Sequence, residues 1–184
     1  MSSLVNPGII NEIGGDILKD KEGVTGFIER IHIIQGDIAA LTVDAIVNAA
    51  SPLAKSEIEF GKRALEDCSP GEARITSGHQ SSAKYIIHIV PPVYQGGDKD
   101  EAKVLYSCYS NSLFLAVENQ VKTIAFPCLS TDTYGYPFQE GCRIAINAVL
   151  DFLQQPEQIL KIFFVCHSDC EYKQFNELLS NRIK

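Results

Sequence analysis

The sequence contains no apolar run that approaches the ~20 residues needed to span a bilayer as a helix. Its first residues, MSSLVNPGIINEIGG, also lack the basic segment and the following apolar segment of a secretory signal. The first absence argues against a membrane partner, and the second argues against secretion. We therefore expect an intracellular protein of the cytoplasm or the nucleus.

Positive charge is scarce as well. Sixteen Lys and Arg residues stand against 23 Asp and Glu residues, which gives a formal net charge of −7. Phosphate backbones are bound chiefly by Lys and Arg, so this balance argues against a nucleic-acid polymer as the main partner. A small anion is a different case, because backbone N–H groups can bind it without any basic side chain.

The chain also lacks a second CxxC or HxxxH pair that could complete a zinc site with Cys166, His167 and Cys170. We expect no metal and no other cofactor. The number of cysteines is even, but a chain of 184 residues with 45% hydrophobic residues can build a core without disulfides. The cysteines therefore fit a reducing compartment; they are Cys68, Cys108, Cys128, Cys142, Cys166 and Cys170.

Regular patterning begins at Phe27, and the preceding residues 1–26 carry five of the 13 glycines. We expect an N-terminal extension, 1–26, and a single domain, 27–184. Short apolar segments predict strands at 27–34, 43–49, 85–90, 123–128 and 161–166. Helical periodicity alternates with them at 57–68, 100–119, 140–153 and 170–183. This alternation predicts an α/β fold, a three-layer α/β/α sandwich around a central sheet.

Ligands of such sheets bind beyond the carboxyl ends of the strands. Small, polar and glycine-bearing segments follow the predicted strands at 36–38, 48–52, 129–137 and 167–169. One of them can turn several backbone N–H groups inward and bind an anion. A plain strand-to-helix turn with capping side chains is the alternative. The loop consists of Ser130, Thr131, Asp132, Thr133, Tyr134 and Gly135.

Several motifs, taken in order, resemble those of macrodomains. The segments GDI at 36–38 and VDAIVNAA at 43–50 resemble the opening motif of the family. The segments PGEARITSG at 70–78 and AKYIIH at 83–88 resemble the middle of its MacroD-type branch. The second half of the match lies at 105–109, 124–131 and 134–137. The resemblance runs from about residue 30 to the C-terminus and implies the macrodomain fold, with a mixed, largely parallel sheet.

The resemblance implies a protein that binds ADP-ribose or an ADP-ribosylated protein. Many such proteins are hydrolases that remove ADP-ribose from proteins or deacetylate O-acetyl-ADP-ribose. In the family, the acid of the Gly-Asp-Ile motif accepts a hydrogen bond from the adenine amino group. Here that acid is Asp37, with the N–H group of Ile38 beside it, and a carboxylate is a strong acceptor. A carboxylate that only caps the following turn is the alternative.

The resemblance also assigns the other ligand residues. Asn48 belongs to the motif whose second asparagine contacts the distal ribose. The Ser130–Gly135 loop would hold the diphosphate through its N–H groups, with Tyr134 packed beside the distal ribose. His167 stands where the family often has an aromatic residue next to adenine. A polar residue at the end of a strand is the alternative for His167.

Glycine is scarce where the resemblance requires it. Ser51 replaces the second asparagine, and a hydroxyl cannot offer both a carbonyl and an NH₂ group. A run of glycines and a catalytic aspartate should follow, but residues 53–63 contain only Gly61. Glu57 and Glu59 are candidate catalytic carboxylates by proximity. Solvated acids in the first turn of a helix are the alternative for both.

Asp132 stands where the family has glycine in the phosphate loop. A like-charge contact at 4 Å costs ~1 kcal/mol in water and ~4 kcal/mol at an effective dielectric constant near 20. We therefore favour a macrodomain that recognises ADP-ribose or a related nucleotide, with hydrolase activity weak or lost. An active hydrolase or deacetylase with a rearranged site is one alternative, and a non-catalytic protein-interaction module is the other.

Overall fold

The computed structural model describes residues 28–49, 68–78, 81–129, 134–155, 159 and 161–183. The predicted N-terminal extension, 1–26, lies outside the described residues. So does the predicted helix at 57–68, apart from Cys68. None of the helices in the described ranges is both long and apolar enough to cross a membrane.

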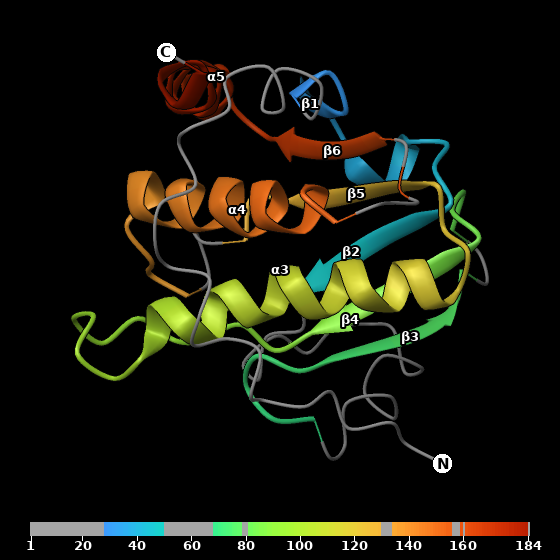
Figure 1. Ribbon diagram of the computed structural model, residues 1–184, viewed down its shortest axis with the longest axis horizontal. Coiled ribbons are helices and arrows are strands. Elements are labelled where there is room, and N and C mark those ends of the chain that lie inside the picture. Colours follow the sequence, from blue (N-terminus) through green and yellow to red (C-terminus); the bar gives the residue numbers. More distant parts are fainter. Residues whose placement is uncertain are drawn as a thin grey trace.

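Six strands form one sheet in the order β1-β6-β5-β2-β4-β3 (Figure 1). All neighbouring strands are parallel except β3, which is antiparallel to β4. All five predicted strands are present, although the first begins at Ile31 rather than at residue 27. The predicted α/β fold with a mixed, largely parallel sheet is confirmed. The strands are β1 (Ile31–Gln35), β2 (Ala45–Ala49), β3 (Ala73–Ser77), β4 (Tyr85–Ile89), β5 (Thr123–Pro127) and β6 (Lys161–Cys166).

The apolar pattern fails to predict β3. Its sequence, ARITS, contains three polar side chains, and only Ala73 is buried. The strand lies at an edge of the sheet, with Ala73 opposite Ile89 of β4. An edge strand has one open side and does not need the continuous apolar run of a strand buried on both faces.

Three long helices follow the sequence prediction closely. They are α3 (Glu101–Glu118), α4 (Phe138–Leu153) and α5 (Asp169–Ile183). Figure 1 shows α3 and α4 side by side, lying along the sheet. Their apolar residues recur at intervals of three and four, which places one side of each helix against the strands.

The core beneath these helices centres on Phe164 of β6. Its ring centroid lies 4.6 Å from that of Phe175 in α5, 6.0 Å from that of Phe126 in β5, and 6.2 Å from that of Tyr109 in α3. All four side chains are at least 98% buried. Since one aromatic cluster joins α3, α5 and two strands, the long helices share one face of the sheet.

The opposite face carries a smaller apolar cluster. Its buried members are Val43, Ala83, Ala125 and Val165, and Ile38 packs against them. Ile38 belongs to a short 3-10 helix, η2 (Ile38–Ala40), which follows β1. The predicted sandwich, a mixed six-stranded sheet flanked by helices, is confirmed.

Candidate functional site

The carboxyl ends of β1, β6, β5 and β2 lie together, because these strands are parallel neighbours. The edge that carries the candidate site is this carboxyl-end side of the sheet, not the side where the edge strand β3 lies. Asp37 follows β1, His167 follows β6, and Asn48 lies near the end of β2. Leu129, which leads into the predicted phosphate loop, follows β5. The fold thus brings these predicted ligand residues to one edge. Ser51, Glu57, Glu59, Ser130, Thr131, Asp132 and Thr133 lie outside the described residues.

The turn after β1 presents Asp37 as an exposed carboxylate. Its Oδ1 accepts a hydrogen bond from the Ala39 N–H group at 2.9 Å, so Asp37 is the N-cap of η2. The preceding N–H group, that of Gly36, donates to the Cys166 carbonyl of β6 at 3.0 Å. Capping uses only part of the acceptor capacity of a carboxylate, which has about four lone-pair sites. Asp37 can therefore cap the turn and still accept from a ligand.

A capping box fixes the chain at His167. The Glu171 carboxylate accepts from the N–H groups of His167 at 2.9 Å and Ser168 at 3.1 Å, and the Glu171 N–H group donates to Ser168 Oγ at 3.2 Å. The Ser-x-x-Glu spacing is a known sequence signal for the start of a helix. Gln35 Nε2 also donates to the His167 carbonyl at 3.5 Å. The exposed His167 therefore lies next to the turn that carries Asp37.

The end of the predicted phosphate loop is anchored to the segment after β4. The Tyr134 carbonyl accepts from the Tyr94 N–H group at 2.9 Å. The ring of Tyr94 lies against that of Tyr136, with centroids 4.9 Å apart. Tyr134 and Tyr136 are buried, and Gly135 between them has a φ of +64°, a conformation that favours glycine.

Glu101, at the start of α3, is a buried carboxylate that neither the motifs nor the strand ends indicate. Only 3% of Glu101 is exposed. Its oxygens accept from the N–H groups of Gln95 at 3.0 Å, Gly97 at 3.2 Å and Lys99 at 2.6 Å. Its own backbone N–H group and those three lower the pKa of Glu101 to about 2. Glu101 thereby shapes the loop that begins at Tyr94 and contacts the end of the phosphate loop.

We expect Glu101→Gln to lower Tm by at least about 5 °C at pH 7, because an amide NH₂ group would face backbone donors. Glu140→Gln is a matched control, since Glu140 is an exposed acid in the first turn of α4. The folded pKa of Glu101 lies below its ordinary value of 4.5. Its contribution to stability is therefore complete above that value and is lost as pH falls toward 2. Thermal melts between pH 4.5 and pH 2 should show the Tm difference between wild type and Glu101→Gln shrinking as pH falls. A constant Tm difference would contradict a stabilising role of the ionised Glu101.

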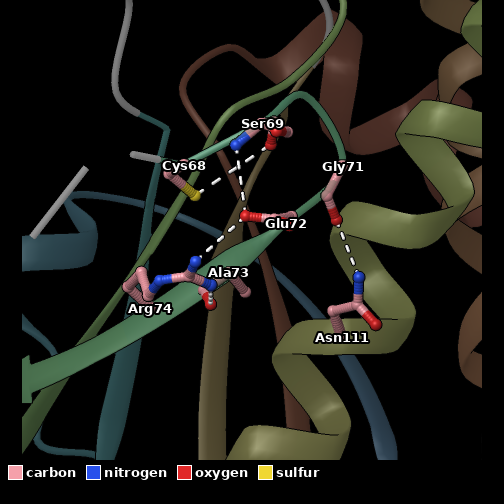
Figure 2. Close-up of polar contacts among 7 residues, drawn as sticks. All are labelled: Cys68, Ser69, Gly71, Glu72, Ala73, Arg74 and Asn111. Carbon is pink, nitrogen blue, oxygen red and sulfur yellow. Dashed lines mark hydrogen bonds and ion pairs between the residues drawn. The ribbon is translucent and has the colours of Figure 1, made fainter. Parts of the chain in front are cut away.

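A hydrogen-bonded turn at residues 69–72 leads into β3 (Figure 2). The Glu72 carboxylate accepts from the Ser69 N–H group at 3.2 Å and from the Arg74 guanidinium at 3.0 Å. Asn111 of α3 donates to the Gly71 carbonyl at 2.8 Å, and the Gly71 N–H group donates to the Val90 carbonyl at 2.9 Å. Val90 follows β4, so this turn lies at the same edge of the sheet as the candidate site.

Next to Asn48 in the sheet lies His88, a fully buried histidine. Its Nε2 shares a hydrogen bond of 2.9 Å with Thr76 Oγ1, and its Nδ1 has no partner among the described residues. Burial lowers the pKa of His88 below its ordinary value of 6.5. The unfolded chain then binds the proton first, so stability should decline as pH falls below 6.5.

Thr76→Val should destabilise the fold by ~1–3 kcal/mol, because it removes the hydrogen-bond partner of a buried imidazole. Thr76→Ser keeps the hydroxyl group and is the matched control. Urea denaturation at pH 7.5 would measure both free energies of unfolding. Equal stability of the two variants would show that the hydroxyl group does not support His88.

The described residues contain no group of three or more His, Cys, Asp or Glu side chains arranged to hold a metal ion. Cys166 is buried, whereas His167 and Cys170 are exposed.

A family model and several known proteins match most of this chain. A model of the Macro domain family matches residues 36–145. A macro domain-containing protein of Methanosarcina mazei is 43% identical over 167 residues, which cover 83% of this chain and 89% of the relative. An O-acetyl-ADP-ribose deacetylase of Citrobacter rodentium is 37% identical over 171 residues, which cover 83% of this chain and 97% of the relative.

The same similarity holds among solved structures. A mutant of the Oceanobacillus iheyensis macrodomain, solved with ADPR, matches with a TM-score of 0.72 at 30% sequence identity. The match covers 82% of this chain and 92% of that chain. Family model, relatives and solved structure thus all point to the family that the sequence motifs resemble. The chain belongs to the macro domain family.

Proposed function

We propose that this protein recognises ADP-ribose, either free or attached to a protein. The observation that carries the proposal is the turn at Asp37. The exposed carboxylate is positioned by the hydrogen bond that it accepts from the Ala39 N–H group. The turn itself is fixed by the hydrogen bond from the Gly36 N–H group to the Cys166 carbonyl of β6. It therefore offers a preorganised acceptor for the adenine amino group. The Oceanobacillus iheyensis macrodomain with ADPR supports the choice of ligand.

The proposal includes weak or absent hydrolase activity and membership of the MacroD-type branch. The branch rests on the motifs at 70–78 and 83–88. Weak activity rests on Ser51, on the single glycine between residues 53 and 63, and on Asp132. Side chains with a Cβ atom keep the backbone farther from a diphosphate than glycine does.

Titration calorimetry and thermal shift with ADP-ribose test the proposal. We expect measurable binding at a ligand concentration of ~1 mM. A Kd of ~1 mM corresponds to a binding free energy of about −4 kcal/mol. Ribose 5-phosphate is the control ligand, because it lacks adenine and the second phosphate group. The absence of both heat and thermal shift with ADP-ribose would refute the proposed recognition and favour a protein-interaction module.

An active enzyme is the second candidate function, and the names of two relatives support it. Proteins of Citrobacter rodentium and Salmonella newport, 37% and 36% identical to this chain, are named O-acetyl-ADP-ribose deacetylases. In that case a carboxylate such as Glu57 or Glu59 would orient the attacking water. Turnover of O-acetyl-ADP-ribose and release of ADP-ribose from a modified protein should then fall in Glu57→Gln or Glu59→Gln. Absent turnover, or turnover unchanged in both variants, would refute this role.

A further inference from the structure

Two cysteines meet at the edge of the sheet that carries the candidate site. Cys128 Sγ lies 3.6 Å from Cys166 Sγ, and both thiols are free. Pro127 and Val165, the residues just before them, are paired in the parallel ladder of β5 and β6. Neighbouring strands lie about 4.8 Å apart, which falls within the Cα separation that a disulfide requires. The separation of the two strands is therefore compatible with a disulfide just beyond this pair.

Exposure distinguishes the two sulfurs. Cys166 is fully buried, whereas Cys128 is partly exposed, which makes Cys128 the more accessible of the two residues. Cys128 donates its S–H group to Cys166, and this donation together with burial raises the pKa of Cys128. The same hydrogen bond lowers the pKa of Cys166, but this residue is fully buried and shielded from an external peroxide, so the raised pKa of Cys128 controls the first step. The thiolate is the reactive form, so oxidation should be slow at pH 7 and should accelerate with rising pH.

We propose that Cys128 and Cys166 form an oxidation site in which a hydroperoxide converts the dithiol into a disulfide and thereby weakens nucleotide binding. In the first step the Cys128 thiolate attacks one oxygen of ROOH. The Cys128 proton has first passed to solvent. An S–O bond forms, the O–O bond breaks, and RO⁻ leaves and takes a proton from solvent to become ROH.

In the second step the Cys166 sulfur attacks the sulfur of the Cys128 sulfenic acid. The S–O bond breaks, the hydroxyl group leaves as water with the Cys166 proton, and the S–S bond forms. The dithiol loses two electrons, and the hydroperoxide gains them.

The link would act on both sides of the candidate site. The two sulfurs must approach from 3.6 Å to about 2.0 Å. Cys128 lies directly before Leu129 and the predicted phosphate loop, and the Cys166 carbonyl holds the Gly36 N–H group beside Asp37. Drawing the sulfurs together therefore shifts the diphosphate side relative to the adenine side. This consequence rests on the proposed recognition of ADP-ribose, whereas the oxidation itself does not.

The first experiment detects the link. The full chain with Cys170→Ser, which lacks the exposed thiol, is treated with hydrogen peroxide at low protein concentration to limit links between chains. Non-reducing peptide mapping should show one crosslink, between Cys128 and Cys166, that dithiothreitol reverses. Cys166→Ser and Cys128→Ser should each abolish it, and Cys142→Ser, which removes a neighbouring thiol, should not. Reduced or overoxidised sulfurs without a link, in protein shown to be folded by circular dichroism, would overturn the proposal.

The second experiment measures coupling to the ligand. Oxidation should weaken ADP-ribose binding by about tenfold, and bound ADP-ribose should slow formation of the crosslink by a similar factor. Cys166→Ser should retain its affinity after peroxide treatment. An unchanged affinity of the crosslinked chain would overturn the coupling. If the reduced chain does not bind ADP-ribose, the proposed function fails, while the peptide map still decides the oxidation site.

Discussion

Asp132→Gly should tighten ADP-ribose binding by about tenfold to a thousandfold, the range that corresponds to a repulsion of ~1–4 kcal/mol. The residue lies outside the described part of the chain, and the expectation comes from its position in the phosphate-loop motif. Glycine would remove the carboxylate from the neighbourhood of the diphosphate and would permit left-handed backbone geometry. Titration calorimetry in low salt would measure the gain.

Asp132→Asn separates charge from backbone geometry. Asparagine keeps the size of the side chain and loses its charge, so an equal gain in both variants would assign the effect to repulsion. A gain in the glycine variant alone would assign it to the backbone. If neither variant changes the affinity, Asp132 does not contact the diphosphate, and the weak-binding hypothesis loses its main physical cause.

Asp37→Ala should weaken ADP-ribose binding by about tenfold to a hundredfold, because a hydrogen bond to a charged acceptor contributes ~1.5–3 kcal/mol. Alanine also removes the cap on Ala39, which could disturb η2. Asp37→Ser is the matched control, since serine is a good N-cap but a shorter and neutral acceptor. The serine variant should therefore keep its fold and still bind weakly.

A change in the ligand tests the same contact from the other side. An ADP-ribose analogue with hypoxanthine in place of adenine carries a carbonyl instead of the amino group. Wild-type protein should discriminate against this analogue, and Asp37→Ala should lose most of that discrimination. Equal discrimination by both proteins would show that Asp37 acts only as the cap of η2.

Most of the sheet could be predicted because its inner strands are buried on both faces. Segments such as 123–128 and 161–166 are nearly continuous in apolar character, and the structure has strands there. β3 could not be found in this way. It is an edge strand that contains polar residues such as Arg74 and Thr76, so it has no continuous apolar run. Its position depends on pairing with β4, which the local sequence does not reveal.

The candidate site divides in a similar way. The positions of Asp37, Asn48 and His167 at one edge follow from parallel strands, and they could be predicted. The role of Glu101 could not, because the burial of a carboxylate depends on three backbone N–H groups contributed by a loop. Glycines 96 and 97, both with positive φ, were the available signal for that loop. The roles of Ser51, Glu57, Glu59 and the 130–133 segment stay predictions.

The antiparallel pairing of β3 has a consequence for how this family can vary. β2 ends at Ala49 and β3 begins at Ala73, and both residues lie level with Ile89 of β4. The chain therefore leaves the sheet and returns to it at the same edge, the one that carries the candidate site. Insertions or deletions between these two points can change the length of the connecting chain without changing the register of any strand. The connection between β2 and β3 can thus vary among relatives while the sheet stays the same.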